Sequence, residues 1–129
     1  MTDDLIPDDV KAFLLRHIDS IAQLEALLLL RAHAELTWSA DTLAKRLYTP
    51  VQETAEILAR LCADGFLAAK GGEPLLYQYH CPSREQAHMV DHVAEVYARY
   101  LIPVTQLIHA KPRTRVQAFA DAFRLRKEG

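Results

Sequence analysis

Glycine is scarce in this 129-residue chain, which has four, and three of them, Gly65, Gly71 and Gly72, fall within one short stretch. Phosphate-binding loops need glycine for sharp turns and close backbone approach, so no other part of the chain offers such a loop. No G-x-S-x-G, P-loop or dinucleotide-binding pattern occurs either. We therefore expect neither enzyme activity nor a bound cofactor.

Cysteine is equally rare, and Cys62 and Cys81 are the only two. One pair does not make the framework of four or six that staples small secreted domains, which favours a reducing, cytoplasmic location. Cys62 falls on the apolar side of a predicted helix, where a free cysteine is usually a small core residue rather than a nucleophile. The chain also lacks the basic start of a signal peptide and any apolar run near the roughly 18 residues of a membrane span, so we expect no membrane contact.

Neither sign of charge dominates: 15 Lys and Arg residues face 17 Asp and Glu, for a net charge of −2. This balance excludes the uniformly basic surface of a protein that coats nucleic acid. The charge is uneven along the chain, with −3 over residues 1–19, −2 over 20–82, −1 over 83–108 and +4 over 109–129. Most of the spare positive charge therefore lies at the C-terminal end.

Helix-forming residues fill most of the chain, which is 50% hydrophobic and therefore able to build a core. A helix-start pattern, Ser or Thr followed three residues later by Gln, precedes four apolar-periodic segments. The four pairs are Ser20 and Gln23, Thr49 and Gln52, Ser83 and Gln86, and Thr114 and Gln117. In each, the hydroxyl is expected to cap the helix and the glutamine to reach back to the capping residue.

These signals predict helices over residues 8–17, 20–33, 40–48 and 50–64, with an extended segment around Trp38, and a β-hairpin over 66–80. The 20–33 helix is apolar nearly all round, which marks it as the central buried helix. Ser39 is expected to cap the 40–48 helix and Gly65 to end the 50–64 helix. On the latter, the predicted buried face is Val51, Ala55, Leu58, Leu61 and Cys62, and the predicted solvent face is Gln52, Glu53, Glu56, Arg60 and Ala63.

The C-terminal third is predicted to be a long amphipathic helix over residues 84–109, followed by a last helix over 115–126. A kink is expected between Arg99 and Pro103, because the proline ring removes an N–H and clashes with the preceding turn. Such a rod is longer than the domain before it and needs a partner. We predict a homodimer interface made of Val90, Val93, Tyr97, Leu101, Val104, Ile108, Phe119 and Phe123.

The order of helix, extended segment, two helices and hairpin resembles the winged helix-turn-helix superfamily. The residues that carry the resemblance are Trp38-Ser39, Leu43-Ala44-x-x-Leu47, the break Tyr48-Thr49, Ala55-x-x-Leu58-x-x-Leu61 and Asp64-Gly65-Phe66-Leu67. With a helix before it and a long helix after it, the whole chain resembles the MarR-like transcription regulators. In these, the terminal helices form the dimer interface and the wing domains contact DNA. The basic wing tip common among them is missing here.

The resemblance implies a mainly α winged-helix fold with a small β-hairpin wing. It divides the chain into an N-terminal helical arm over residues 1–19, a winged-helix domain over 20–82, and a C-terminal helical dimerisation region with a basic tail over 83–129. It also implies a transcriptional regulator that binds duplex DNA as a homodimer. An effector site between the wing domain and the dimer helices is typical of such regulators, but no residue here specifies a ligand.

If the fold binds DNA as its relatives do, the 50–64 helix enters the major groove and the wing touches the backbone. The candidate contacts are Lys45, Arg46, Thr49, Gln52, Glu53, Glu56, Arg60 and Lys70. Gln52 can pair with adenine and a glutamate can accept from cytosine. Residues 20–82 hold only five Lys and Arg against seven acids, however, so this part alone should bind DNA weakly.

Other interpretations of the same residues remain. Glu53 and Glu56 are also what a solvated first helical turn prefers, and Lys45 and Arg46 suit any helix C-terminus. The competing function is a winged-helix protein-protein interaction module without DNA-binding activity, which an acidic helix would suit. The hairpin residues Leu75, Leu76, Tyr77 and Tyr79 fit that function or ordinary packing of the wing on the core.

The cluster that most resembles a metal site is His88 and His92, four residues apart on one predicted helix and preceded by His80 and Cys81. The same helix carries Asp91, Glu95 and Arg99, whose spacing equally makes a polar helix face. No second cysteine pair and no H-E-x-x-H pattern accompanies the histidines. We therefore expect no bound metal.

Overall fold

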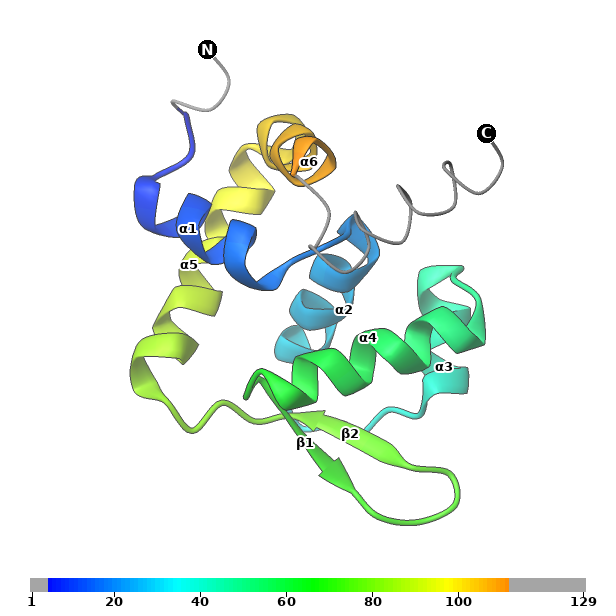
Figure 1. Ribbon diagram of the computed structural model, residues 1–129. Coiled ribbons are helices and arrows are strands. Elements are labelled where there is room, and N and C mark those ends of the chain that lie inside the picture. Colours follow the sequence, from blue (N-terminus) through cyan, green and yellow to red (C-terminus); the bar gives the residue numbers. More distant parts are fainter. Residues whose placement is uncertain (1–4, 112–129) are drawn as a thin grey trace, which may run out of the picture.

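The structure, a computed structural model, describes residues 5–111 (Figure 1). The elements are α1 (Asp8–His17), α2 (Ile21–Ala32), α3 (Ala40–Leu47), α4 (Val51–Ala63), β1 (Leu67–Lys70), β2 (Leu76–Tyr79), α5 (Arg84–Arg99) and α6 (Leu101–Ala110). This confirms the predicted order and the mainly α class with one hairpin. The helix predicted over 115–126, with the Thr114 cap, Phe119 and Phe123, lies outside the described residues.

α2 is the central helix, as its apolar sequence predicts. Leu24, Ala26, Leu27 and Leu30 have no exposed surface, and α2 packs against α3, α4 and β2. α1 packs against α5, and α5 against α6, so that one hydrophobic core runs through all parts of the described chain. Figure 1 shows α6 and the wing at opposite ends of the molecule. No helix within residues 5–111 is long and apolar enough to cross a membrane.

The wing is an antiparallel hairpin in which Leu67 faces Tyr79 and Lys70 faces Leu76. The predicted extended segment around Trp38 is confirmed, because Trp38 and Tyr77 exchange two backbone hydrogen bonds of 2.8 Å. Tyr77 is buried and Tyr79 lies half-buried against the core. The packing interpretation of these two aromatic residues is therefore confirmed.

Three of the predicted helix caps are present. The hydroxyls of Ser20, Ser39 and Ser83 each accept a hydrogen bond from the backbone N–H three residues later, at 3.1 to 3.2 Å. The second predicted hydrogen bond, from the glutamine side chain back to the backbone of the capping serine, is wrong for Gln23 and Gln86. Gln23 accepts from the Asp19 N–H, and Gln86 donates to the carbonyl of Asp64.

The cap predicted at Thr49 is wrong. α4 begins after Pro50, and its N-terminus has no side-chain cap. The Thr49 hydroxyl donates to the carbonyl of Leu47 at 3.2 Å. Because Pro50 itself takes the capping position, Thr49 lies one residue too far from the helix to serve it.

Gly65 terminates α4 as predicted, two residues after the last helical residue, Ala63. Gly65 has φ +92°, a left-handed conformation that glycine adopts without strain. Its N–H donates to the Cys62 carbonyl and the Phe66 N–H donates to the Leu61 carbonyl, both at 3.1 Å. This is the Schellman arrangement, and it directs the chain from α4 into the wing.

The buried face predicted for α4 is partly wrong. Leu58 and Leu61 are fully buried as expected, but Val51 is 48% exposed, and Thr54 and Ile57 are buried instead. The Thr54 hydroxyl donates to the Pro50 carbonyl at 2.9 Å, which satisfies it inside the core. The helix is therefore rotated about its axis relative to the prediction.

The predicted kink in the long C-terminal helix is confirmed as a full break. Tyr100, with φ −126° and ψ 55°, separates α5 from α6. Pro103 has no N–H to donate to the Arg99 carbonyl, and its ring disfavours a continuous helix at this point.

Candidate nucleic-acid interface

α3, a tight turn and α4 form a helix-turn-helix. Tyr48 makes the turn with a left-handed backbone, φ 57° and ψ 45°, and the Thr49 N–H donates to the Ala44 carbonyl at 3.1 Å. α3 packs directly on α4. The Tyr48 side chain is 95% exposed. The sequence marks Tyr48 only as a helix break, because no local pattern distinguishes an outward-facing tyrosine from a core one.

The outward face of α4 is small and weakly charged. Gln52, Glu56, Ala59 and Ala63 follow one another at helical spacing and are all exposed. The Gln52 amide donates to Glu56 at 3.4 Å. The first N–H groups of α4 have no side-chain acceptor, and they lie at the positive end of the helix dipole. This end of α4 can therefore receive an anionic group.

Arg60, predicted to lie near the DNA backbone, is held by two carboxylates. Its Nη1 is 3.2 Å from Asp19 Oδ2, and its Nε is 3.3 Å from Asp64 Oδ2. The same Asp64 oxygen is 3.3 Å from His17 Nδ1. The structure thus places Arg60 in a network of charged groups at the C-terminal end of α4, whereas Gln52 lies at the opposite, N-terminal end of the helix.

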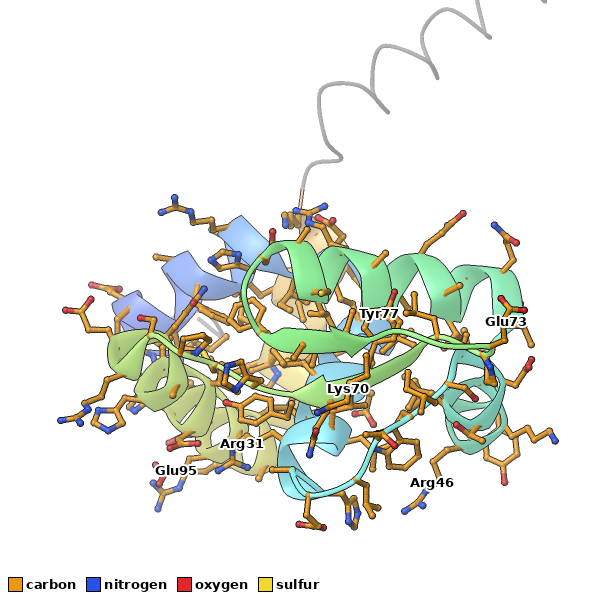
Figure 2. All side chains as sticks on the ribbon, turned by 90° about the horizontal axis from the view of Figure 1, so that it is seen from below. Arg31, Arg46, Lys70, Glu73, Tyr77 and Glu95 are labelled. Atoms are coloured by element: carbon orange, nitrogen blue, oxygen red, sulfur yellow. The ribbon has the colours of Figure 1, made fainter. Side chains whose placement is uncertain are left out.

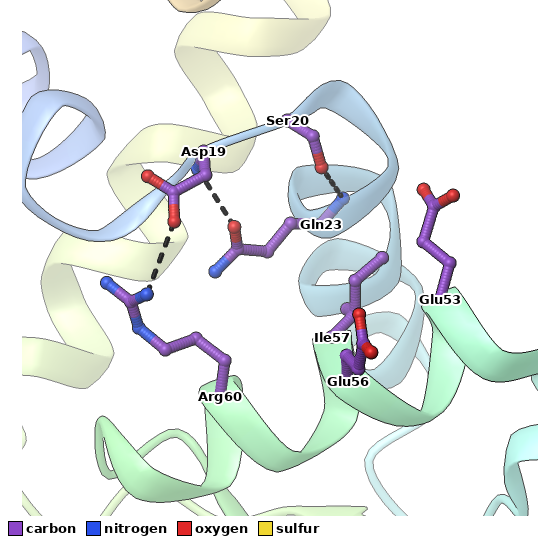
Figure 3. A pocket seen from close by; sticks show the side chains of 7 residues that line it. All are labelled: Asp19, Ser20, Gln23, Glu53, Glu56, Ile57 and Arg60. Atoms are coloured by element: carbon purple, nitrogen blue, oxygen red, sulfur yellow. Dashed lines mark hydrogen bonds and ion pairs between the residues drawn. The ribbon is translucent and has the colours of Figure 1, made fainter. Parts of the chain in front are cut away.

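Glu53 and Glu56 line a groove of about 180 Å³ between α4 and the turn that joins α1 to α2. Figure 3 shows them along the same stretch of α4 as Arg60, whose guanidinium reaches Asp19. The remaining lining residues are Ser20, Gln23 and Ile57. Two carboxylates that were candidate base contacts thus share this flank of α4.

The candidate phosphate contacts are exposed but dispersed. Lys45 and Arg46 lie on the last turn of α3, and Lys70 ends β1 in the wing. In Figure 2, Arg46 extends from α3 on the side away from α4. The helix-turn-helix is therefore flanked by cations from two separate elements and has none at the centre of its outward face.

The predicted dimer residues within residues 5–111 differ in exposure. Val90, Val93, Val104 and Ile108 are at most 3% exposed and fill the core of their own chain. Tyr97 is partly buried against the same core, and its hydroxyl donates to Glu25 at 2.7 Å. Leu101 is 51% exposed, and Ile102, which the prediction missed, is 59% exposed. Leu5, 48% exposed, lines a groove of about 240 Å³ with Arg99 and Tyr100 and so lies beside them.

The histidines of α5 are not brought into a metal-binding arrangement. Within residues 5–111, no group of three or more His, Cys, Asp or Glu side chains is placed to hold a metal ion. His92 Nε2 is buried and has no hydrogen-bond partner among the described residues. Burial and the nearby Asp91 charge raise the pKa of the Cys81 thiol, which lowers its thiolate fraction and reactivity.

The comparisons with known proteins show the fold. No protein-family model matches the sequence, and no curated protein matches it. The crystal structure of wild-type MarR from E. coli in its apo form matches with a TM-score of 0.52 at 16% identity, covering 98% of this chain and 86% of that one. The chain has the MarR winged-helix fold.

Two further structures with this fold extend the comparison. Sco5413, a MarR family transcriptional regulator from Streptomyces coelicolor, matches with a TM-score of 0.54 at 16% identity, covering 93% of this chain and 81% of that one. A mutant of E. coli MarR complexed with operator DNA matches with a TM-score of 0.51 at 15% identity, covering 95% and 83%. At these identities, the likeness concerns architecture alone.

Proposed function

We propose that this chain is a cytoplasmic transcriptional regulator that binds duplex DNA as a homodimer through α4 and the wing. The observation that carries the proposal is the helix-turn-helix itself: it presents Gln52 and the uncapped N-terminus of α4 on the surface, next to a β-hairpin wing. The MarR fold supports the proposal, since one structure with this fold was crystallised with operator DNA.

The proposed contacts follow from the chemistry of each group. Gln52 reads a base edge, because its amide can pair with adenine in the major groove. Lys45, Arg46 and Lys70 contact phosphates, together with Thr49 and the free N–H groups at the start of α4. Arg60 keeps the orientation of α4 through Asp19 and does not touch DNA.

The proposed dimer surface lies at the end of the molecule opposite the wing (Figure 1). Leu101 and Ile102 are exposed directly after the break at Tyr100, and Leu5, also exposed, lines a groove with Tyr100. Exposed apolar groups gathered in one place on a small domain are typical of interaction sites. Phe119 and Phe123 remain proposed members of the same interface. A homodimer carries two α4 helices, one for each half-site of a two-fold symmetric DNA sequence.

Selection from a random duplex pool, followed by fluorescence anisotropy on the enriched sequence, tests the proposal. We expect enrichment of one paired-half-site sequence. Gln52→Ala should lose about 1–3 kcal/mol of discrimination at one base pair of each half-site. Gln106→Ala, which removes an exposed amide on α6, is the matched control and should leave the base preference of the selected sequence unchanged. Absence of any enriched sequence would contradict sequence-specific binding.

A second candidate function, the protein-protein interaction module, is favoured by the exposed apolar residues at the helix-turn-helix. Tyr48, in the turn before α4, and Val51, the first residue of α4, are 95% and 48% exposed, although this helix is expected to meet a polar groove. Salt dependence separates the two functions. Three phosphate-contacting cations on each of two subunits predict that log K falls by about 5 per decade of salt. A flat response from about 50 to 200 mM salt would favour the protein partner.

A further inference from the structure

Val51, the first residue of α4, is half exposed although the sequence predicts it on the buried face. Leu58 and Leu61, its predicted neighbours on that face, are fully buried. In a helix each Cα–Cβ bond tilts toward the N-terminus, so the side chains of the first turn extend past the end of the helix. Val51 and Gln52 therefore extend together from the N-terminal end of α4, which is the end of a recognition helix that meets base edges.

A half-exposed valine at this position contributes little to the fold. A β-branched residue is a weaker helix former than alanine or leucine, because it loses rotamer freedom against the neighbouring turn. The stabilisation from burial is also smaller, because much of the Val51 side chain stays in solvent. The apolar surface of Val51 is therefore available to a partner, and in the proposed function that partner is DNA.

The first two turns of α4 lack the cations that usually read guanine. In the major groove guanine presents two acceptors, O6 and N7, and arginine or lysine is their usual partner. Residues 51–58 contain neither, and the one cation of α4, Arg60, is held by two carboxylates at the other end of the helix. Glu56 adds another acceptor beside Gln52, which disfavours a base edge made of acceptors. The chemistry of this end of α4 thus points away from G·C pairs.

The same groups fit an adenine and a thymine. The Gln52 amide nitrogen donates to Glu56 at 3.4 Å, which leaves its carbonyl oxygen free to accept from adenine N6 and its second N–H free to donate to adenine N7. Thymine carries a methyl group at C5 in the major groove, and apolar side chains contact it. Val51 supplies such a side chain directly beside Gln52.

We propose that Val51 is a specificity-determining residue that contacts the C5-methyl group of a thymine next to the base pair read by Gln52. The contact rests on the proposed function and names the class of half-site, which has adjacent A·T pairs where α4 enters the groove. Consecutive residues of a helix diverge by about 100°, so the two side chains meet neighbouring base pairs rather than the same one.

Replacing thymine by deoxyuridine tests this contact, because the change removes the methyl group and keeps the base pairing. Native protein is titrated into the duplex enriched by selection, with one thymine position replaced at a time in both half-sites, and fluorescence anisotropy measures the affinity. We expect one position, next to the base pair affected by Gln52→Ala, at which the replacement weakens binding. The loss should be about 4-fold per half-site, the contribution of one buried methyl group.

A variant of the protein identifies the side chain that reads the methyl group. Val51→Ala should weaken binding to the thymine duplex and bind the thymine and deoxyuridine duplexes almost equally. Alanine is the better helix former and Val51 is half exposed, so the urea unfolding midpoint should change little. Leu75→Ala, at an equally exposed apolar residue beside the wing, is the matched control and should keep the full deoxyuridine effect.

Failure of this contact differs from failure of the proposed function. If selection with the native protein enriches no sequence, both are overturned. If the native protein binds its selected duplex but no thymine methyl group affects the affinity, only the Val51 contact is overturned. The same holds if the deoxyuridine effect persists in Val51→Ala, or if the base pairs next to the one read by Gln52 are G·C.

Discussion

Arg60 Nη1 lies 3.2 Å from Asp19 Oδ2, joining residues that are 41 positions apart in the chain. The other Asp19 oxygen holds Lys111 at 2.9 Å. The end of α4, the start of α2 and the end of α6 therefore meet at one carboxylate. Because both Arg60 and Asp19 are about two-fifths exposed, this network contributes more to the orientation of α4 than to stability.

Replacing Arg60 should separate this orienting role from DNA contact. Arg60→Gln is expected to lower the free energy of unfolding by only about 0.2–1 kcal/mol, the range of exposed ion pairs, as measured in urea. It should leave the salt dependence of DNA binding unchanged, because the guanidinium is held by Asp19 and Asp64. Arg46→Gln should instead reduce the slope of log K against log salt by about 0.9 per subunit. An equal reduction with Arg60→Gln would show that the network opens and Arg60 reaches a phosphate.

Glycine to alanine substitutions at the two ends of the wing should differ in sign. At Gly65 an added Cβ has room, since its nearest neighbour is Gln86 Oε1 at 3.5 Å, but φ is +92°. Gly65→Ala should therefore cost about 1–2 kcal/mol from the left-handed backbone alone. Gly71 has no atom within 4 Å of an added Cβ and no left-handed φ. Gly71→Ala should be neutral or stabilise by up to about 1 kcal/mol through the unfolded chain. Thermal unfolding of both variants measures the difference.

The helix boundaries could be predicted because residues at or next to each boundary determine where the helix begins or ends. Serine caps and a glycine after α4 act within a few residues of the boundary they set. The rotation of α4 could not be predicted in the same way, because Thr54 looks polar in sequence but donates to Pro50 within its own helix and is fully buried. A side chain that satisfies its hydrogen bond locally behaves as an apolar one in the core.

The candidate site was less predictable than the fold, since it depends on contacts between distant residues. Nothing near Arg60 in sequence reveals that its guanidinium pairs with Asp19, 41 positions earlier in the chain. The apolar spacing of Val90 and Val93 identifies a buried helix face, but it does not tell whether the same chain or a second copy covers that face. Here the covering residues belong to the same chain, which moves the candidate dimer surface to Leu101 and Ile102.

Two tyrosines should ionise late in an alkaline titration. Burial, together with the Glu25 carboxylate that accepts a 2.7 Å hydrogen bond from its hydroxyl, raises the pKa of Tyr97 to about 12. Burial and nearby negative charge raise the pKa of Tyr79 to about 12 as well. In ultraviolet difference spectra, Tyr97→Phe and Tyr79→Phe should each remove one tyrosine from the transition near pH 12.

The same shifts predict how stability depends on pH. Between pH 10 and 12 the unfolded chain has released these two protons while the folded chain still holds them. The unfolded state is therefore favoured progressively, and the stability that both groups contribute below pH 10 is lost as pH rises through 12. Urea midpoints should fall less steeply over this interval in Tyr97→Phe. An unchanged slope would mean that Tyr97 titrates alike in both states.

Charge placed at the break between α5 and α6 should dissociate the proposed homodimer. Leu101 and Ile102 are 51% and 59% exposed in the single chain, so Leu101→Asp combined with Ile102→Asp leaves the core intact and should change stability little. In a dimer interface, the same two carboxylates would be desolvated without partners, which is strongly unfavourable. Sedimentation velocity should therefore show a dimer for the native protein and a monomer for this variant. Leu75→Asp, at an equally exposed leucine beside the wing, is the matched control and should remain dimeric. If the native protein sediments as a monomer, or if only the Leu75 variant dissociates, the interface does not lie at the break.

A monomeric but folded Leu101, Ile102 variant should also lose affinity for the selected DNA, because each subunit would then bind only one half-site.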